Sequence, residues 1–283
     1  MGLNGFQKLR RAFKMSWFQG GIAVNKRTLS LSILMILIPI IGYCQQDIIR
    51  IVADQTYWYP FTYSHGGQAK GIHIDMVQKA LSNLNFDVRF YPKPWKRCLQ
   101  DAKNGKYDAI VSVSHKQERT AFLIYPDDAA NPGKSLWRIT QVEYVVITNS
   151  HEPYTFDGDL KSLPQPLRAP LGYSIADDLK STGIKVFEAP DTMDCVTRLV
   201  KSGRGSFITP LKNALDLQFE KQFKGKLRIH STPLKSKSYF LGFIIKNQKI
   251  DRRQMTDIWN EIARLREDKS FMKELLNKYS GQK

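Results

Sequence analysis

Apolar residues along this chain fall into two alternating patterns. Short runs rich in β-branched and aromatic residues are typical of buried strands, and they alternate with segments whose apolar residues recur at helical spacing. The expected strands are 48–53, 86–91, 109–113, 142–148, 206–209 and 240–246, and the expected helices are 76–84, 95–102, 175–179, 191–203, 251–265 and 271–276. Because a strand, a helix and a further strand follow one another, the pattern predicts parallel α/β sheets.

The periodic pattern breaks over residues 122–137, where prolines, aspartates and a glycine interrupt any regular spacing. The chain has 283 residues, of which 42% are hydrophobic, so it can bury one large core or two modest ones. A chain of this length and hydrophobic content is therefore compatible with two lobes.

The first 44 residues are typical of a targeting segment rather than of the fold. Asn25–Arg27 supplies a basic flank, and Leu29–Ile41 supplies an apolar run of signal-peptide length after a long polar extension. Cleavage after Cys44 would leave Gln45 as the new amino terminus. Lipidation of Cys44 is the less favoured alternative, because Tyr43 stands where that signal normally has a small residue. The segment predicts export through the Sec pathway.

The formal net charge of +17 suggests an anionic partner. Residues 1–44 contain six Lys and Arg and no acid, so their removal leaves 37 basic against 26 acidic residues, or +11. The remaining basic residues are scattered, without the clustering of arginines and aromatic residues that nucleic-acid binding uses. We therefore expect no nucleic-acid partner.

One stretch, Gly105–Arg119, combines a strand with candidate binding chemistry. Ala109–Val113 is an expected strand that ends in a polar segment. Ser112 and Ser114 lie two residues apart, so on an extended backbone both hydroxyls face the same side, and Arg119 adds a planar cation. Hydroxyls and a guanidinium suit a carboxylate. A buried strand followed by a solvated loop would also explain the stretch.

Several short motifs, in this order and spacing, resemble one protein family. They are Arg50–Phe61 with its aromatic loop, the Gly-x-x-x-Asp motif of Gly71–Asp75, Pro94–Trp95, and Gly-Lys-Tyr-Asp-Ala-Ile at 105–110 followed by Ser-x-Ser and Glu-Arg. The combination resembles bacterial periplasmic solute-binding proteins of family 3, which serve polar amino acid ABC transporters.

The resemblance implies a two-lobed α/β fold of the periplasmic-binding-protein type 2. Each lobe would be a mainly parallel sheet flanked by helices, and two crossover strands would join the lobes. Lobe 1 would comprise residues 45–136 and 238–283, and lobe 2 residues 137–237. Cys98 and Cys195 then fall in different lobes, and we expect both to be buried and reduced. The His73-x-Asp75 pair alone predicts no metal site, and nothing predicts a cofactor.

The same resemblance implies a ligand site in lobe 1. Arg119 would hold a carboxylate, and Ser112 and Ser114 would add hydrogen bonds. Tyr57 or Trp58 would form an aromatic wall, and the residues leave open which of the two faces the ligand.

Further site residues are expected at three helix starts. Asp75 is expected to cap one helix, and Trp95 begins another, where core packing explains it equally well. Gly172, Tyr173 and Ser174 precede a third, where free backbone N–H groups can bind an anion. Capping alone also explains Ser174.

The sequence departs from the family's pattern at one strand. Where an aspartate commonly pairs with the ligand's ammonium group, Ser206 and Pro210 stand in the candidate places. An unpaired buried ammonium is costly, so we expect selection against simple α-amino acids. The expected solute is an acid without a free α-amino group, or one whose positive charge lies elsewhere.

Three classes of function remain. The leading hypothesis is a monomeric periplasmic protein that binds a small carboxylate-bearing solute and delivers it to an inner-membrane ABC transporter permease. The alternatives are a periplasmic enzyme of the same fold, such as a lyase resembling cyclohexadienyl dehydratase, and a ligand-sensing module. We expect no enzyme, because no acid in the sequence is nominated as a general acid by its motif.

Overall fold

The computed structural model describes residues 48–131, 133–247 and 249–280. Its strands are β1 (Ile49–Asp54), β2 (Tyr63–His65), β3 (Gln68–Lys70), β4 (Val88–Lys93), β5 (Ala109–Ser114), β6 (Leu123–Ile124), β7 (Thr140–Asn149), β8 (Leu167–Pro170), β9 (Val186–Ala189), β10 (Ser206–Pro210), β11 (Leu227–Ile229) and β12 (Lys235–Ile244). Its helices are α2 (Ile72–Asn83), α3 (Trp95–Lys103), α4 (Ser174–Ser181), α5 (Thr192–Ser202), α6 (Leu211–Phe219), α7 (Arg252–Glu267) and α8 (Lys269–Ser280), with 3₁₀ turns η1 (Gln117–Arg119) and η2 (Leu160–Ser162).

The main sheet runs in the order β4-β1-β5-β12-β7-β10-β8-β9, and β6 and β11 pair with β12 and β7. Strands β4, β1 and β5 are parallel in lobe 1, and β10, β8 and β9 are parallel in lobe 2. The expected two-lobed α/β fold is confirmed. The antiparallel strands β7 and β12 make the sheet mixed rather than wholly parallel.

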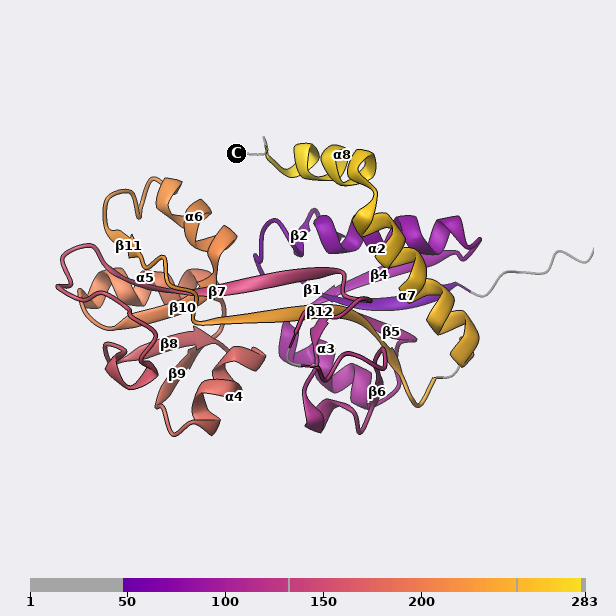
Figure 1. The fold of residues 1–283 in the computed structure, drawn as a ribbon, viewed down its shortest axis with the longest axis horizontal. Coiled ribbons are helices and arrows are strands. Elements are labelled where there is room, and N and C mark those ends of the chain that lie inside the picture. Colours follow the sequence, from indigo (N-terminus) through magenta and orange to yellow (C-terminus); the bar gives the residue numbers. More distant parts are fainter. Residues whose placement is uncertain (1–47, 132, 248, 281–283) are drawn as a thin grey trace, which may run out of the picture. The chain divides into compact units, whose positions relative to one another are not determined.

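The two crossover strands β7 and β12 run between the lobes (Figure 1). Residues 235–239 of β12 pair with β7, and residues 239–243 pair with β5, so one strand takes part in both halves of the sheet. The expected lobe boundaries fall just before β7, at residue 137, and within β12, at residue 238. Backbone hydrogen bonds therefore continue from one lobe into the other.

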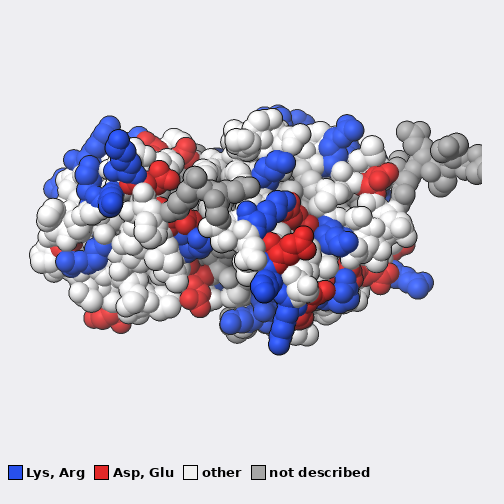
Figure 2. Space-filling view, turned by 90° about the horizontal axis from the view of Figure 1, so that it is seen from above, with Lys and Arg blue, Asp and Glu red and all other residues white. Residues whose placement is uncertain are grey.

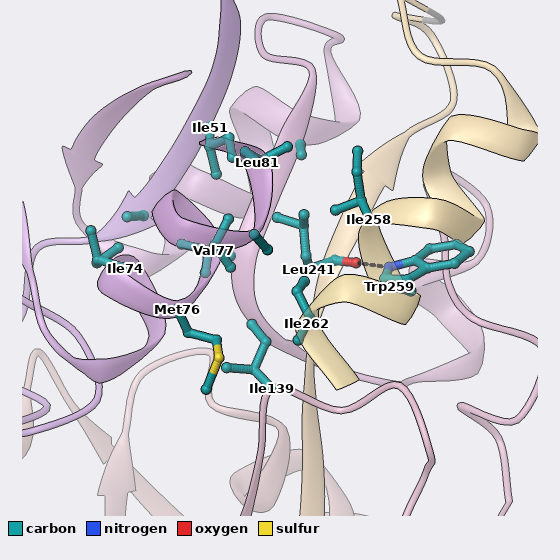
Figure 3. Close-up of a cluster of buried hydrophobic side chains, with 14 of the residues drawn as sticks. Ile51, Ile74, Met76, Val77, Leu81, Ile139, Leu241, Ile258, Trp259 and Ile262 are labelled. Atoms are coloured by element: carbon teal, nitrogen blue, oxygen red, sulfur yellow. Dashed lines mark hydrogen bonds between the residues drawn. The ribbon is translucent and has the colours of Figure 1, made fainter. Parts of the chain in front are cut away.

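The core of lobe 1 lies between the sheet and helices α2 and α7 (Figure 3). Met76, Val77 and Leu81 of α2 are fully buried there. Trp259 of α7 is also buried, and its indole Nε1 donates a hydrogen bond of 2.9 Å to the Leu241 carbonyl oxygen. Replacing Trp259 by alanine would cost about 3 to 5 kcal/mol, because it leaves a cavity and an unpaired carbonyl.

The start of α2 corrects one expectation. The helix begins at Ile72, so Asp75 lies within its first turn and does not cap it. Gly71 precedes the helix with a φ of 122°, and a Cβ atom there would lie 2.3 Å from the Phe61 carbonyl oxygen. Only glycine allows the chain to turn this closely against residue 61, and this turn starts the helix four residues earlier than expected.

Two other helix starts follow the sequence. Asp191 caps α5 by accepting a hydrogen bond from the Asp194 backbone N–H. Asp251 forms a capping box with Gln254 at the start of α7. The helices expected over 191–203 and 251–265 each begin at one of these aspartates.

Cys98 and Cys195 are both buried and free, as expected. Among the residues that the structure describes, no group of His, Cys, Asp and Glu could hold a metal ion, and no helix is long and apolar enough to cross a membrane. The predicted signal peptide and Cys44 lie outside the described residues.

Candidate ligand-binding site

A small cavity lies between the lobes, at the carboxyl ends of β1 and β5 and the start of α4. Its volume is about 20 Å³. It is lined by Asp54, Trp58, Trp95, Ser112, Ser114, Arg119, Tyr173, Ser174 and Tyr239. Loops at the carboxyl ends of parallel strands are where ligands bind in α/β sheets, so this cavity is the candidate site.

Arg119 is a buried cation with only uncharged hydrogen-bond partners. It lies in η1, directly after β5, and its side chain is 4% exposed. Its Nη1 donates to the carbonyl oxygen and to Oγ of Ser114, at 3.1 and 3.3 Å, and its Nη2 donates to the Gly172 carbonyl oxygen at 3.5 Å. The guanidinium also lies 5.7 Å from the Trp95 ring centroid. A buried cation without a carboxylate partner is costly, which favours an anion at this place.

The two serines reach the cavity by a different route from the one expected. Ser112 has a φ of 65° and lies at a bulge opposite Phe240 and Leu241, so β5 is not extended here. A hydrogen bond of 2.8 Å joins Ser112 Oγ to His73 Nδ1, whereas Ser114 Oγ donates to Ser174 Oγ at 2.7 Å. The extra residue of a bulge re-aims the side chains, so the alternation argument was wrong even though both hydroxyls line the cavity.

Burial separates the two candidate wall residues. Tyr57 is 43% exposed and stacks on Tyr59, outside the cavity lining. Trp58 is 3% exposed and lines the cavity, and the centroids of its ring and of the Tyr239 ring are 4.9 Å apart. Its buried indole Nε1 has no hydrogen-bond partner among the described residues. Of the two candidates, Trp58 alone therefore borders the cavity, and its indole N–H is a free donor.

The segment at residues 172–174 contacts lobe 1 with its side chains and a carbonyl. The Gly172 backbone N–H donates to Glu188, and its carbonyl oxygen accepts a hydrogen bond of 2.9 Å from Trp95 Nε1. Tyr173 OH donates to Asp54 Oδ2 at 3.1 Å. The Gly172 N–H is thus occupied by Glu188 and is not available to an anion. The segment also joins lobe 2 to lobe 1.

Asp54 is one of two lining residues that the sequence analysis missed, and Tyr239 is the other. Asp54 ends β1, is buried, and accepts hydrogen bonds from the side chain and backbone N–H of Thr56 as well as from Tyr173. Burial raises the pKa of Asp54 to about 6, against the opposing effect of the Thr56 hydrogen bonds. Its signal in the sequence was an acid at the carboxyl end of the first strand, just before the aromatic loop.

Residues 49–282 match the family described as bacterial extracellular solute-binding proteins, family 3. The chain belongs to this family. No curated protein matches it closely enough to be counted a relative.

Solved structures with the same fold include the substrate-binding protein of an amino acid ABC transporter, at 14% identity, with a TM-score of 0.62 and coverage of 83% of this chain and all of that one. A histidine kinase sensor domain similar to periplasmic binding proteins has 15% identity, a TM-score of 0.68 and coverage of 83% and 97%. An ancestral amino acid-binding protein, described as a precursor of cyclohexadienyl dehydratase, has 15% identity, a TM-score of 0.60 and coverage of 88% and 98%. At these identities the likeness shows the fold alone.

Three residues considered from the sequence lie away from the cavity of this solute-binding protein. Asp75 accepts hydrogen bonds from Lys278 Nζ and Tyr279 OH, at 2.6 and 2.8 Å, and so joins α2 to α8. Ser206 Oγ donates to the Pro164 carbonyl oxygen, and Pro210 contributes to a different pocket.

Asp178 of α4 forms a charged contact beside the cavity of the solute-binding protein. It lies within 3.0 Å of the ammonium groups of Lys116, Lys235 and Lys237. Burial alone would raise the pKa of Asp178, but these lysines hold it well below its usual range. Burial lowers the pKa of Lys237 to about 8, although Asp178 opposes the shift. Because Lys116 follows β5, its pair with Asp178 links lobe 1 to lobe 2.

Proposed function

We propose that this protein binds a small carboxylate-bearing solute between its lobes and delivers it to an inner-membrane ABC transporter. The observation that carries the proposal is Arg119, a buried guanidinium without a carboxylate partner among the described residues, at the carboxyl ends of the strands. Family membership supports the binding role. We further propose that the protein acts as a monomer in the periplasm.

The charges around the cavity suggest how a solute would be oriented. Its carboxylate would bond to Arg119 and to the free indole N–H of Trp58. Asp54 would face a positively charged group of the solute. The aromatic side chains of Trp58, Trp95 and Tyr173 line the same cavity as Asp54 and Arg119. An amino-acid-like solute whose positive charge reaches Asp54 fits this arrangement, because Ser206 and Pro210 supply no acid.

Binding requires the lobes to separate first. A cavity of about 20 Å³ holds roughly one water molecule, which is far smaller than an amino acid. The contacts that must open include Ser114 with Ser174, Trp95 with Gly172, and Tyr173 with Asp54. All three join lobe 1 to residues 172–174 at the start of α4. Bending of β7 and β12 would allow this opening and the later closure around a solute.

The test is a thermal-shift screen of the twenty amino acids beside organic acids and amines. It is combined with mass spectrometry of any solute that co-purifies with the periplasmically expressed protein. We expect one class of small carboxylate to raise the melting temperature of wild type and of Arg89→Ala, an exposed control on β4, but not of Arg119→Ala. A solute without a carboxylate that stabilises all three proteins equally would contradict the proposal.

A second candidate function is acid-catalysed dehydration, favoured by one observation. Asp54 lines a closed, aromatic cavity with its pKa raised to about 6, so part of it carries a proton near neutral pH. A protonated carboxyl can donate that proton to a leaving hydroxyl group, which departs as water while the ring loses its carboxylate as carbon dioxide and becomes aromatic. Purified protein would then convert a cyclohexadienyl acid, and Asp54→Asn would abolish the conversion. If the protein bound such an acid without converting it, the result would contradict the enzymatic function and leave solute transport as the proposed function.

A further inference from the structure

Lobe 2 carries a second concave site that shares no lining residue with the cavity around Arg119. It lies between β8, β9, η2 and the carboxyl-terminal end of α5, and its volume is about 1200 Å³. We call it the distal groove and define it by Lys161, Arg168, Lys185, Phe187, Lys201 and Arg204. Pockets for drug-sized ligands measure roughly 300 to 1,000 Å³, so this groove suits a larger occupant.

The charge in the distal groove is almost entirely positive. Arg198 also lines it but pairs with Asp194. Glu188, the acid in the lining, is committed to Lys180 and to the Gly172 backbone N–H. Figure 2, which views the molecule from the side of α6 and α8, shows basic and acidic side chains side by side over much of that face. The lining of the distal groove, by contrast, carries an excess of positive charge.

Arg168 gives the distal groove a fixed cation at its base. It is 7% exposed, and its guanidinium donates to the carbonyl oxygens of Pro166 and Arg204, at 3.1 and 3.3 Å, and to Ser202 Oγ at 3.1 Å. No carboxylate pairs with it in the described part of the chain. A Cβ atom on Gly205 would lie 2.9 Å from Arg168 Nη1, so the backbone leaves room for the guanidinium. An arriving carboxylate would compensate this buried charge.

The lining of the distal groove is not only ionic. Phe187 is 45% exposed, and Lys185 Nζ lies 5.0 Å from its ring centroid. Leu160 and Ile184 add further apolar surface. A purely ionic polymer would leave this surface unused, and a flat membrane would not reach the guanidinium of Arg168 at the base of a concave site.

We propose that the distal groove docks an acidic peptide segment of a partner protein. Carboxylates of the segment bond to Arg168, Lys201 and Arg204, and an apolar side chain of the segment packs on Phe187. Charge complementarity supports this occupant, and so does the mixture of cations with exposed apolar surface. The site is independent of the proposed solute binding, because the two linings have no residue in common.

The experiment measures fluorescence anisotropy of a short labelled peptide of alternating glutamate and phenylalanine, with a lysine and phenylalanine peptide as the control. We expect saturable binding of the acidic peptide that weakens as salt rises. The double variant Lys185→Glu/Arg204→Glu should weaken this binding about tenfold or more. The matched double variant Lys224→Glu/Lys226→Glu changes charge equally on an exposed loop outside the groove, and it should change the affinity by less than about twofold.

Arg119→Ala serves as a second control, because it should leave peptide binding unchanged while solute binding is lost. Circular dichroism and melting temperature establish that each variant is folded. Equal loss of peptide binding in both double variants would show a nonspecific charge effect and overturn the proposal. Absence of saturable binding would overturn it as well. Tighter, groove-dependent binding of inorganic polyphosphate or of anionic lipid vesicles would assign the groove to a different partner.

Discussion

Two buried arginines distinguish the two concave sites of this solute-binding protein. Arg119 and Arg168 both lack a carboxylate partner in the described residues, yet their surroundings differ. Arg119 lies in a cavity of about 20 Å³ that lobe contacts close, and Arg168 lies at the base of an open groove of about 1200 Å³. The proposed carboxylate binding would therefore require lobe motion at Arg119 but not at Arg168.

The largest effect should come from replacing each of these two arginines by alanine in turn. We expect Arg119→Ala to lose about 2 to 5 kcal/mol of solute-binding free energy, at least ~30-fold in Kd, because the carboxylate would be buried without a cation. Arg168→Ala should leave the solute's Kd unchanged. Calorimetric titration of both variants measures the difference. Equal losses would show that the cavity and the groove are coupled.

Removal of Arg119 should cost little folding stability. The substitution loses hydrogen bonds to Ser114 and Gly172 but also relieves a buried charge of its desolvation cost. We therefore expect the free energy of unfolding to change by about 1 to 2 kcal/mol at most. A larger loss of unfolding free energy, measured by urea denaturation, would show that the Arg119 guanidinium mainly stabilises the fold.

Asp54 should make stability depend on pH. Its pKa is about 6 in the folded protein and 3.8 as the ordinary value, so the folded state holds the extra proton between these pH values. Stability from this group is thus complete below pH 3.8 and is lost as pH rises to about 6, by ~3 kcal/mol in total.

The variant Asp54→Asn should remove that loss and be more stable than wild type at pH 7. The pKa of His73, lowered by burial to about 3, gives an opposite slope as pH falls below 6.5, and it is common to both proteins. The difference between their unfolding curves from pH 4 to 7 therefore isolates Asp54. Parallel curves would contradict the raised pKa.

A smaller effect should come from the charged contact between the lobes. Lys116→Met removes the 2.9 Å pair with Asp178, which we expect to weaken the closed form by about 1 kcal/mol. Solute affinity should fall by at most about fivefold, and X-ray scattering of the ligand-free protein should show a larger radius of gyration. Lys103→Met, an exposed lysine of α3, is the control and should change neither quantity.

The fold was largely predictable because its elements obey local rules. Helical spacing and aspartate caps located α5 and α7. The start of α2 was misplaced because it depends on a close approach of Gly71 to Phe61, and no local pattern reveals such a contact. The mixed sheet likewise arises from strand pairing between distant segments.

The candidate site was predictable where family motifs mark it. The structure places Arg119, Ser114 and Trp58 around one cavity, together with Trp95 and Tyr173. Asp75 lies apart from them. Other features depend on tertiary structure alone.

Those features are the raised pKa of Asp54, the bulge of β5 at Ser112, and the distal groove. Asp54 gains its raised pKa mainly through burial in the folded protein, and Ser112 turns because β5 bulges against β12. The cations of the distal groove come from η2, from β8, from the residue before β9 and from the end of α5, so the sequence showed them as scattered.

The most direct test of solute binding compares a screened carboxylate solute with its carboxamide, which differs only in charge at the group that Arg119 would hold. Calorimetric titration of wild type should favour the acid by at least ~30-fold, because a charge-assisted pair to a buried guanidinium is lost in the carboxamide. In Arg119→Ala the two compounds should bind with equal, weak affinity. Wild type that binds both equally, or a variant that still prefers the acid, would contradict the assignment of this cavity to a carboxylate.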